Sequence, residues 1–226
     1  MKKTICVSYP RSGHHLLVRL LEAYFGKEFK YCEPYRHCRR TPCVIPEINF
    51  QKTHDFGLTL EQPLGYRCII QYRHPLESIV SNYKLKLVHK KRFRLTDSRL
   101  LWRWFVKKEI KYWAGFVNKW LLSPDCENRL LLSYHDLLEN PKARLRDVIM
   151  HIADNGKIDE TLIKAIVQKE NIEPKNSLAQ FKYFNKDLFL GMEKDLSEEI
   201  QSLGLPYRML QPSVSRRAEI TAAGSS

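Results

Sequence analysis

The turn after the first apolar run has the composition of an anion-binding loop. In SYPRSGHHLL, residues 8–17, Arg11 carries a fixed positive charge, Ser12 offers a hydroxyl, and Gly13 lets a ligand approach the backbone. The helix expected next begins at about His14, and its free N–H groups and positive dipole end attract negative charge. The sequence therefore predicts a phosphate-binding loop, although the Gly-Lys-Ser/Thr of a Walker A motif is absent.

Two further groups of reactive or phosphate-binding residues lie at or just after the carboxyl ends of predicted strands. Lys52 and His54 lie in QKTHDF, and histidine is the side chain best suited to act as a general base near neutral pH. Arg73 and Ser81 lie eight residues apart on one broad face of a predicted helix, and both side chains can bind phosphate oxygens. No aspartate for magnesium follows the strand before Arg73, which disfavours a magnesium-dependent kinase.

Alternating strand and helix patterns position these three groups. Near-continuous apolar runs are typical of buried parallel strands, and they occur at residues 4–8, about 49–54, 67–72 and 129–134. Helical patterns separate or follow them, at residues 14–25, 76–88, 100–122, 136–140, 141–152, 159–169 and 194–203. This order predicts an α/β fold, a three-layer sandwich in which helices cover both faces of a central parallel sheet. Ligands bind such sheets beyond the carboxyl ends of the strands, where all three groups lie.

Length and charge bound the remaining possibilities. The 226 residues are enough for one large domain, and we expect it to span residues 1–210, with a flexible tail at 211–226. No apolar run approaches the ~18–20 residues that span a bilayer, and no signal peptide is recognisable, so we expect a cytoplasmic protein. The net charge is +13, and residues 84–111 hold eleven Lys or Arg against two acids. This segment predicts a surface that attracts anions.

The six cysteines include one close group. Cys6 and Cys68 lie in apolar strand-like runs and are expected to be buried thiols. Cys32, Cys38 and Cys43 surround a histidine in YCEPYRHCRRTPC, but no C-x-x-C pair is present. We therefore expect reduced thiols rather than a zinc site, and no metal.

Four segments together resemble one enzyme family. SYPRSGHHLL is similar to the 5′-phosphosulfate loop of sulfotransferases that use 3′-phosphoadenosine-5′-phosphosulfate (PAPS), and QYRHPLESIVSNY is similar to their 3′-phosphate motif. QKTHDF resembles the family's Lys-x-His strand end, and SYHDLLENPKARLRDVI resembles its Tyr-Glu-Asp-Leu segment. The matches come in family order over residues 4–152. The resemblance implies a P-loop-NTPase-like fold and a sulfotransferase that releases 3′,5′-ADP from PAPS, with no metal.

The resemblance also implies roles for individual residues. His54 falls on the position of the family's general base, and Lys52 and Arg11 supply positive charge to the group in transfer. Arg11 and eight further positions would bind the nucleotide. The further positions are Ser12, Gly13, His14, His15, Leu16, Arg73, Ser81 and Tyr134.

Several positions depart from the family pattern. His14 and His15 replace two threonines, and Leu16 stands where many members have an adenine-stacking tryptophan. Glu77 occupies the acid position of the 3′-phosphate motif. The late Arg-Lys-Gly segment is not found, and Arg216-Arg217 lies too near the end of the sequence to replace it. We expect weaker donor binding or a contribution from other basic residues.

The acceptor and two other classes of function stay open at this stage. We expect an acceptor with a hydroxyl, and the basic segment 84–111 favours a glycan or another anionic molecule. Nucleic acid is not expected, whereas peripheral membrane contact fits the charge. The alternatives are a P-loop-type kinase without its lysine, and a basic nucleic-acid- or membrane-binding protein.

Overall fold

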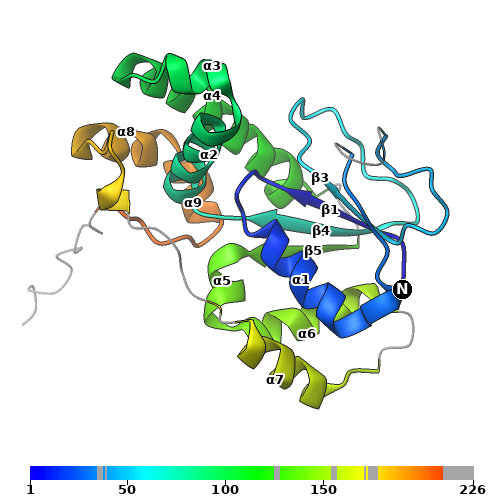
Figure 1. Ribbon diagram of the computed structural model, residues 1–226. Coiled ribbons are helices and arrows are strands. Elements are labelled where there is room, and N and C mark those ends of the chain that lie inside the picture. The colour runs from blue at the N-terminus through cyan, green and yellow to red at the C-terminus, as the bar shows by residue number, and fades with distance from the viewer. Residues whose placement is uncertain are drawn as a thin grey trace, which may run out of the picture.

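A five-stranded parallel sheet forms the centre of the part of the chain that the structure describes. The computed structural model describes residues 1–34, 38, 40–124, 128–153, 157–170, 172 and 178–210. The strand order is β2-β3-β1-β4-β5, and every neighbouring pair is parallel (Figure 1). The strands are β1 (Thr4–Ser8), β2 (Tyr31–Cys32), β3 (Phe50–Thr53), β4 (Arg67–Tyr72) and β5 (Arg129–Ser133).

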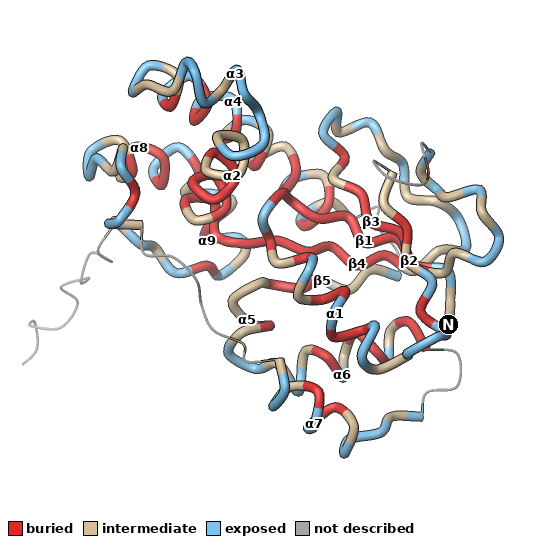
Figure 2. The backbone as a smooth tube through the Cα atoms, in the orientation of Figure 1, coloured by how far each residue is buried: buried red, intermediate tan, exposed pale blue. Residues whose placement is uncertain are grey.

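The central strands are buried on both faces, as their apolar sequences predict. Every residue of β1 and β3 is buried, and Figure 2 shows the sheet as the buried centre of the molecule. Successive side chains point to opposite faces, so Ile5 and Val7 enter one hydrophobic core while Cys6 enters the other. Lys52 is the register partner of Cys6 on the neighbouring strand, so the two side chains point to the same face of the sheet. Gln51, the residue before Lys52, therefore points to the opposite face.

Helices cover the two faces of the sheet in separate layers. The apolar sides of α1, α6 and α7 build the core on one face, and those of α2, α4, α8 and α9 build the core on the other (Figure 1). The first layer comprises α1 (His14–Phe25), α6 (Pro141–Ile152) and α7 (Glu160–Lys169), with α5 (Tyr134–Glu139) leading into α6. The second comprises α2 (Pro75–His89), α3 (Lys91–Leu95), α4 (Arg99–Val117), α8 (Lys186–Asp195) and α9 (Ser197–Ser202).

The predicted α/β sandwich is confirmed, and the differences lie in short or edge elements. The two-residue strand β2 and the helices α3 and α8 were not predicted. The helix predicted over 194–203 is wrong in its first part, because α8 ends at Asp195 and α9 begins at Ser197. Leu196 between them is fully buried in the core, so packing sets the break. The helix predicted to reach residue 122 ends at Val117 and continues as a π-helical turn, Asn118–Leu122.

Other sequence expectations concern buried thiols, the tail and membrane spans. Cys6 and Cys68 are fully buried, as predicted. Cys126 and the segment 211–226, with Arg216-Arg217, lie outside the described residues. Among the described helices, none is long and apolar enough to cross a membrane. Two single-turn 3-10 segments, Gly26–Glu28 and Leu178–Gln180, complete the secondary structure of the described residues.

Candidate functional site

A cleft of about 510 Å³ lies at the carboxyl ends of the central strands, where open α/β sheets bind ligands. It contains all of the predicted site residues except Ser12. A larger cleft of about 830 Å³ lies at the amino ends of the strands, next to Lys3 and Arg67, on the side of the sheet where such folds rarely bind substrates. The predicted residues that line the first cleft are Arg11, Gly13, His14, His15, Leu16, Lys52, His54, Arg73, Ser81 and Tyr134.

The loop between β1 and α1 has a backbone that only glycine fits at one position. Gly13 has a φ of +85°, and the Cβ of any other residue would lie 2.2 Å from Cδ2 of Tyr134. Arg11 also has a left-handed backbone, with a φ of +69°. The carbonyl of Gly13 accepts the first hydrogen bonds of α1, from the amides of Leu16 and Leu17. The loop therefore presents its backbone and the N-terminus of α1 to the cleft.

Two polar groups of this loop are buried without a hydrogen-bond partner among the described atoms. They are Oγ of Ser12 and Nδ1 of His14. Nε2 of His14 lies 3.1 Å from the hydroxyl of Tyr31. Burial, together with the positive charge of Lys52, holds the pKa of His14 well below its usual range, so this histidine is neutral at pH 7. Because Tyr31 donates its hydroxyl proton to Glu33, Nε2 of the neutral His14 ring donates to Tyr31, and Nδ1 is an acceptor. A buried polar group without a partner is costly, and an anion in the loop would accept a hydrogen bond from the Ser12 hydroxyl.

The pair of histidines that opens α1 divides into two environments. His14 is 4% exposed, whereas His15 lies on the solvent side of the cleft. Their rings meet edge-on, with centroids 6.3 Å apart. Leu16 is half-buried on the same rim. Only His14 is therefore placed to act as a buried hydrogen-bonding group in the loop.

Lys52 brings a buried cation into the cleft from the middle of the sheet. It is 6% exposed, and its ammonium lies 3.9 Å from Oε1 of Glu33. Glu33 also accepts a hydrogen bond of 2.6 Å from the hydroxyl of Tyr31, which in turn contacts His14. The edge strand β2 and the residue after it therefore support Lys52 and His14, which line the cleft.

His54 follows β3 directly, and the backbone of β1 holds its ring. Nδ1 lies 2.7 Å from the carbonyl oxygen of Ser8 and 3.3 Å from the Ser8 hydroxyl. A carbonyl oxygen can only accept, so Nδ1 carries the proton and the basic lone pair is on Nε2. Burial, together with the charge of Lys52, lowers the pKa of His54 to about 4. The imidazole is therefore neutral at pH 7 and able to accept a proton.

The turn after His54 is anchored by a buried carboxylate and an aromatic cluster. Asp55 accepts hydrogen bonds from the amides of Thr59 and Leu60, and its other oxygen accepts from the indole of Trp120. The hydroxyl of Tyr112 donates to the carbonyl of His54. These contacts fix the position of the His54 backbone from both sides.

Arg73 and Ser81 meet Arg11 on the other side of the cleft. Nε of Arg11 donates to Oγ of Ser81 at 3.0 Å, and the guanidinium of Arg73 lies 4.5 Å from the centre of the Tyr134 ring. Arg73 is 6% exposed, and its Nη1 is 3.5 Å from the carbonyl oxygen of Arg11. Two arginines, a hydroxyl and an aromatic face thus converge at one end of the cleft.

Glu77 holds Arg73 in place and connects it to the end of the described chain. Its carboxylate lies 2.9 Å from Nε of Arg73, 2.9 Å from Nε2 of His135 and 3.1 Å from Nη2 of Arg208. Although burial acts to raise it, the hydrogen bond from His135 and the charge of Arg73 lower the pKa of Glu77 to about 2. Arg208 therefore brings a late basic residue close to Arg73, which the sequence alone did not reveal.

Other residues around the cleft were also missed by sequence reasoning. Buried Glu109 of α4 accepts hydrogen bonds from Tyr9, at 2.8 Å, and from Asn82, at 3.1 Å, and so ties the start of the loop to α2. Phe56 lines the cleft beside His54 and is 58% exposed. The isolated acid in the aromatic stripe of 100–122 was the available signal for Glu109, whereas nothing in the sequence marked Phe56.

Solved sulfotransferase structures share this architecture. Mouse sulfotransferase SULT7A1 in complex with PAP resembles the chain with a TM-score of 0.62 and 16% identity, over 88% of this chain and 84% of that one. Retinol dehydratase in complex with retinol and PAP has a TM-score of 0.57 and 14% identity, over 92% and 84%. A sulfotransferase from Alicyclobacillus acidocaldarius has a TM-score of 0.53 and 12% identity, over 92% and 97%.

Sequence comparison alone identifies no relative. No protein-family model matches the chain, and no curated protein matches it. The likeness at 12–16% identity therefore concerns the arrangement of the backbone. The chain has the α/β fold of these sulfotransferases, with a five-stranded parallel sheet between two layers of helices.

Proposed function

We propose that this protein transfers the sulfuryl group of PAPS to an acceptor hydroxyl and releases 3′,5′-ADP. The observation that supports this proposal most strongly is that one cleft contains an anion-binding loop, a buried lysine, and a neutral histidine whose ring is held by a hydrogen bond. The shared fold with sulfotransferases solved in complex with PAP supports the same assignment.

The loop after β1 fits the phosphosulfate end of the donor. Gly13 has no Cβ, so the Tyr134 ring can pack directly against the loop, and the buried Ser12 hydroxyl is a hydrogen-bond donor that the phosphosulfate would satisfy. Arg11 adds charge at the mouth of the loop. His14 stands where many sulfotransferases have a hydroxyl, and it would contribute its backbone N–H at the start of α1 to the donor.

Arg73, Ser81 and Arg11 would bind the 3′-phosphate. Arginine grips phosphate oxygens bidentately, and a serine hydroxyl donates to them. The Tyr134 ring beneath Arg73 offers a flat face for the adenine. This arrangement explains how the site would distinguish PAPS from ATP, which lacks the 3′-phosphate.

His54 would act as the general base. The acceptor hydroxyl gives its proton to Nε2 of His54 while the acceptor oxygen forms a bond to sulfur, and the bond between sulfur and the phosphate oxygen breaks. Lys52 and Arg11 supply positive charge where negative charge develops on the sulfuryl and phosphate oxygens. The negative donor would raise the pKa of His54 from about 4 toward neutrality, which strengthens the base.

The alternative functions leave parts of this cleft unexplained. Glu170 is the one carboxylate among the described residues that line it, and Glu170 pairs with Arg19 at 2.9 Å. A kinase would instead need a carboxylate for magnesium at the end of β4, where Arg73 and His74 stand. The exposed basic residues of 84–111 would serve nucleic acid or a membrane, but they would not require a buried Lys52.

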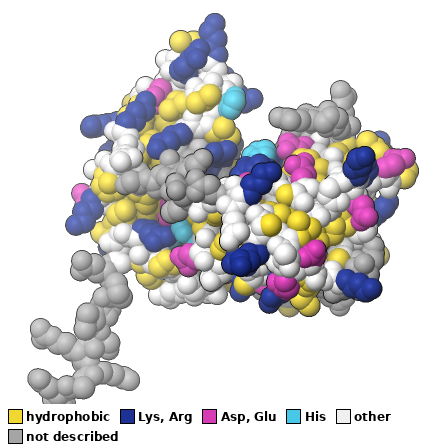
Figure 3. Space-filling model, turned by 60° about the horizontal axis from the view of Figure 1, so that its bottom comes forward, with side chains coloured by type: hydrophobic (Ala, Val, Ile, Leu, Met, Phe, Trp, Pro, Cys, Tyr) yellow, Lys and Arg dark blue, Asp and Glu magenta, His cyan; other side chains and the backbone are white. Residues whose placement is uncertain are grey.

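The acceptor would enter past His54 and Phe56. The exposed aromatic ring of Phe56 suits an acceptor with a flat or apolar face, and Lys and Arg side chains are prominent on the face of the molecule in Figure 3. We propose a hydroxyl on a ring-bearing molecule, with a glycan or another anionic acceptor favoured by the basic segment 84–111.

Ligand-induced thermal stabilisation tests the donor assignment without knowledge of the acceptor. We expect 3′,5′-ADP to raise the unfolding temperature, and ATP with magnesium or an oligonucleotide to have little effect. Arg73→Gln should abolish the response to 3′,5′-ADP. Arg67→Gln is the matched control, because Arg67 begins β4 at the opposite end from the cleft and should leave the response intact. Stabilisation by ATP with magnesium alone would contradict the proposal.

A further inference from the structure

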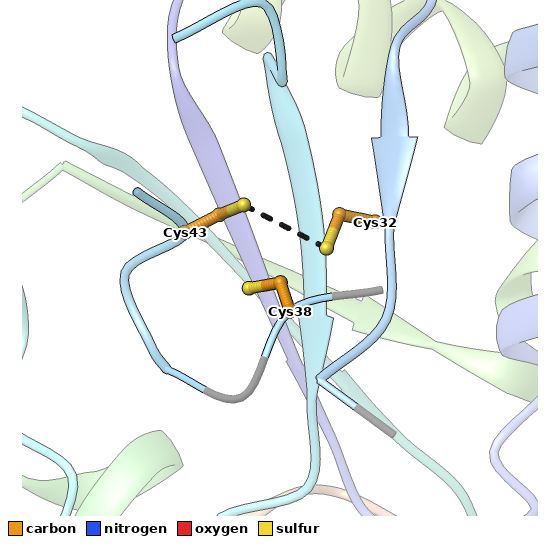
Figure 4. Close-up of side chains that lie close together, drawn as sticks. All are labelled: Cys32, Cys38 and Cys43. Carbon is orange, nitrogen blue, oxygen red and sulfur yellow. Dashed lines mark hydrogen bonds between the residues drawn. The ribbon is translucent and has the colours of Figure 1, made fainter. Parts of the chain in front are cut away.

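Three cysteines converge beside the edge strand β2, away from the cleft. Cys32 is the last residue of β2, and Cys38 and Cys43 belong to the segment that follows it. Figure 4 shows their side chains turned toward one another, and the three sulfur atoms lie within 4.8 Å of each other. Cys32 and Cys38 are buried and Cys43 is half-buried.

The spacing of the sulfur atoms matches a tetrahedral metal site. A Zn–S bond of about 2.3 Å places two sulfurs of a tetrahedron about 3.8 Å apart, against about 4.0 Å in a trigonal plane. The Sγ atoms of Cys43 and Cys32 are 3.7 Å apart. The Sγ atom of Cys38 lies within 4.8 Å of both.

A buried glutamine holds the cluster together. Gln51 of β3 is 2% exposed, and its amide nitrogen donates to the sulfur of Cys38 at 3.3 Å and to the carbonyl of Arg40 at 2.7 Å. Its amide oxygen accepts from the backbone N–H of Cys43 at 2.8 Å. Donors to a ligand atom, and groups that fix the ligand's backbone, are the usual surroundings of a metal site.

We propose that Cys32, Cys38 and Cys43 bind one Zn²⁺ as a tri-thiolate site. Thiolates select soft or borderline cations over magnesium and calcium, and no fourth His, Cys, Asp or Glu joins the cluster within the described ranges. Binding replaces the thiol protons, which pass to solvent, and forms three Zn–S bonds without any change of oxidation state.

The bound zinc would stabilise the wall of the cleft. Gln51 is adjacent to Lys52, and β2 leads directly to Glu33, whose carboxylate lies 3.9 Å from the Lys52 ammonium. Because metal binding contributes to folding free energy, zinc would stabilise the edge of the sheet that carries Lys52. This inference does not depend on the proposed reaction.

Zinc titration of the reduced, full-length protein tests the site. With a chromophoric chelator as competitor, we expect one Zn²⁺ per chain. The variants Cys32→Ser, Cys38→Ser and Cys43→Ser should each bind at least about 100-fold more weakly, and Gln51→Leu about 10–100-fold more weakly. Cys68→Ala, which removes a buried thiol outside the cluster, is the control and should bind like the wild type.

X-ray absorption at the zinc edge gives a test that needs no variant. We expect about three sulfur neighbours at about 2.3 Å in the wild-type protein. The proposal is overturned if the reduced protein takes up no stoichiometric zinc, if the bound zinc has mainly nitrogen and oxygen neighbours, or if Cys68→Ala loses as much affinity as the cluster variants. A Cys32–Cys43 disulfide that persists in reductant, seen by mass spectrometry, would also overturn it.

Discussion

Replacement of Gly13 by alanine places a methyl group where the site has no room. The new Cβ would lie 2.2 Å from Cδ2 and 2.5 Å from Cε2 of Tyr134. Ordinary contact begins at 3.4 Å, so the ring or the loop must move by about 1.2 Å. The ring packs against the guanidinium of Arg73, at 4.5 Å from its centre. The movement therefore disturbs both ends of the proposed donor site.

The expected loss of stability in Gly13→Ala is the sum of two free-energy costs. A left-handed backbone costs a residue with a Cβ about 1–2 kcal/mol. Displacement of Tyr134 from Arg73 forfeits a cation–π contact of about 0.5–1 kcal/mol. We expect Gly13→Ala to lower the free energy of unfolding by about 1.5–3 kcal/mol, which urea denaturation measures. Loss of one charge-assisted hydrogen bond between Arg73 and the 3′-phosphate should weaken 3′,5′-ADP binding by about 10–100-fold, measured by isothermal titration calorimetry.

Two controls separate these costs. Gly65 has a φ of +76° and no heavy atom within 4 Å of the place that a Cβ would take, so Gly65→Ala tests the backbone cost alone and should leave 3′,5′-ADP binding unchanged. In a Tyr134→Ala background the clash is absent, and Gly13→Ala should then cost only what Gly65→Ala costs. The reasoning is refuted if Gly13→Ala binds 3′,5′-ADP within twofold of the wild type.

Four further predictions concern the reaction and the recognition of the donor nucleotide. His54→Ala should keep 3′,5′-ADP binding while PAPS turnover falls by about 10²–10⁴-fold, and comparable turnover would remove His54 from the mechanism. In the wild type, kcat/KM for PAPS, which reports the free enzyme, should be constant around neutrality and fall tenfold per pH unit below about pH 4, because protonated His54 cannot accept a proton. A midpoint near the ordinary histidine value of about 6.5 would contradict this. Lys52→Met should lower kcat by about 10²–10³-fold, whereas an unchanged kcat would mean that Lys52 is structural. Arg73→Gln should reduce the affinity ratio of 3′,5′-ADP to 5′-AMP by at least about tenfold, and an unchanged ratio would place the 3′-phosphate elsewhere.

The buried parallel strands could be predicted because each one is a short, near-continuous run of apolar residues in the sequence. Thr4–Ser8 and Arg67–Tyr72 have the predicted bounds, since a run of buried apolar residues admits few alternatives. The helices His14–Phe25 and Pro141–Ile152 also match, because Gly13 and Pro141 mark their starts. The ends of helices could thus be predicted from the local sequence wherever the residue at the end had a strong backbone preference.

The remaining elements depend on contacts between distant segments. Strand β2 has two residues and exists because Tyr31 pairs with Phe50 and Cys32 pairs with Gln51. The break between α8 and α9 reflects the burial of Leu196 against the sheet-covering core. Neither effect leaves a periodic signal in the sequence.

The residues of the candidate site also divide into those that a local sequence pattern indicates and those that only the folded chain brings together. Residues in contiguous motifs, such as Arg11 and His54, could be proposed from sequence because their spacing is short and specific. Glu33, Glu109 and Arg208 reach the site through pairings that span tens of residues, which no local pattern encodes. The close approach of the sulfurs of Cys32 and Cys43 likewise required the folded chain.

Transfer of ³⁵S from labelled PAPS tests the proposed reaction most directly. The wild type and His54→Ala would be incubated in parallel with phenols, steroids, lipids, peptides and glycans, with binding of 3′,5′-ADP to both proteins verified beforehand. We predict a labelled product from the wild type with at least one acceptor class, and at least about 100-fold less from His54→Ala. Equal labelling by the two proteins, or the absence of any labelled product from wild-type protein that binds 3′,5′-ADP, would contradict a sulfotransferase that uses His54 as its base.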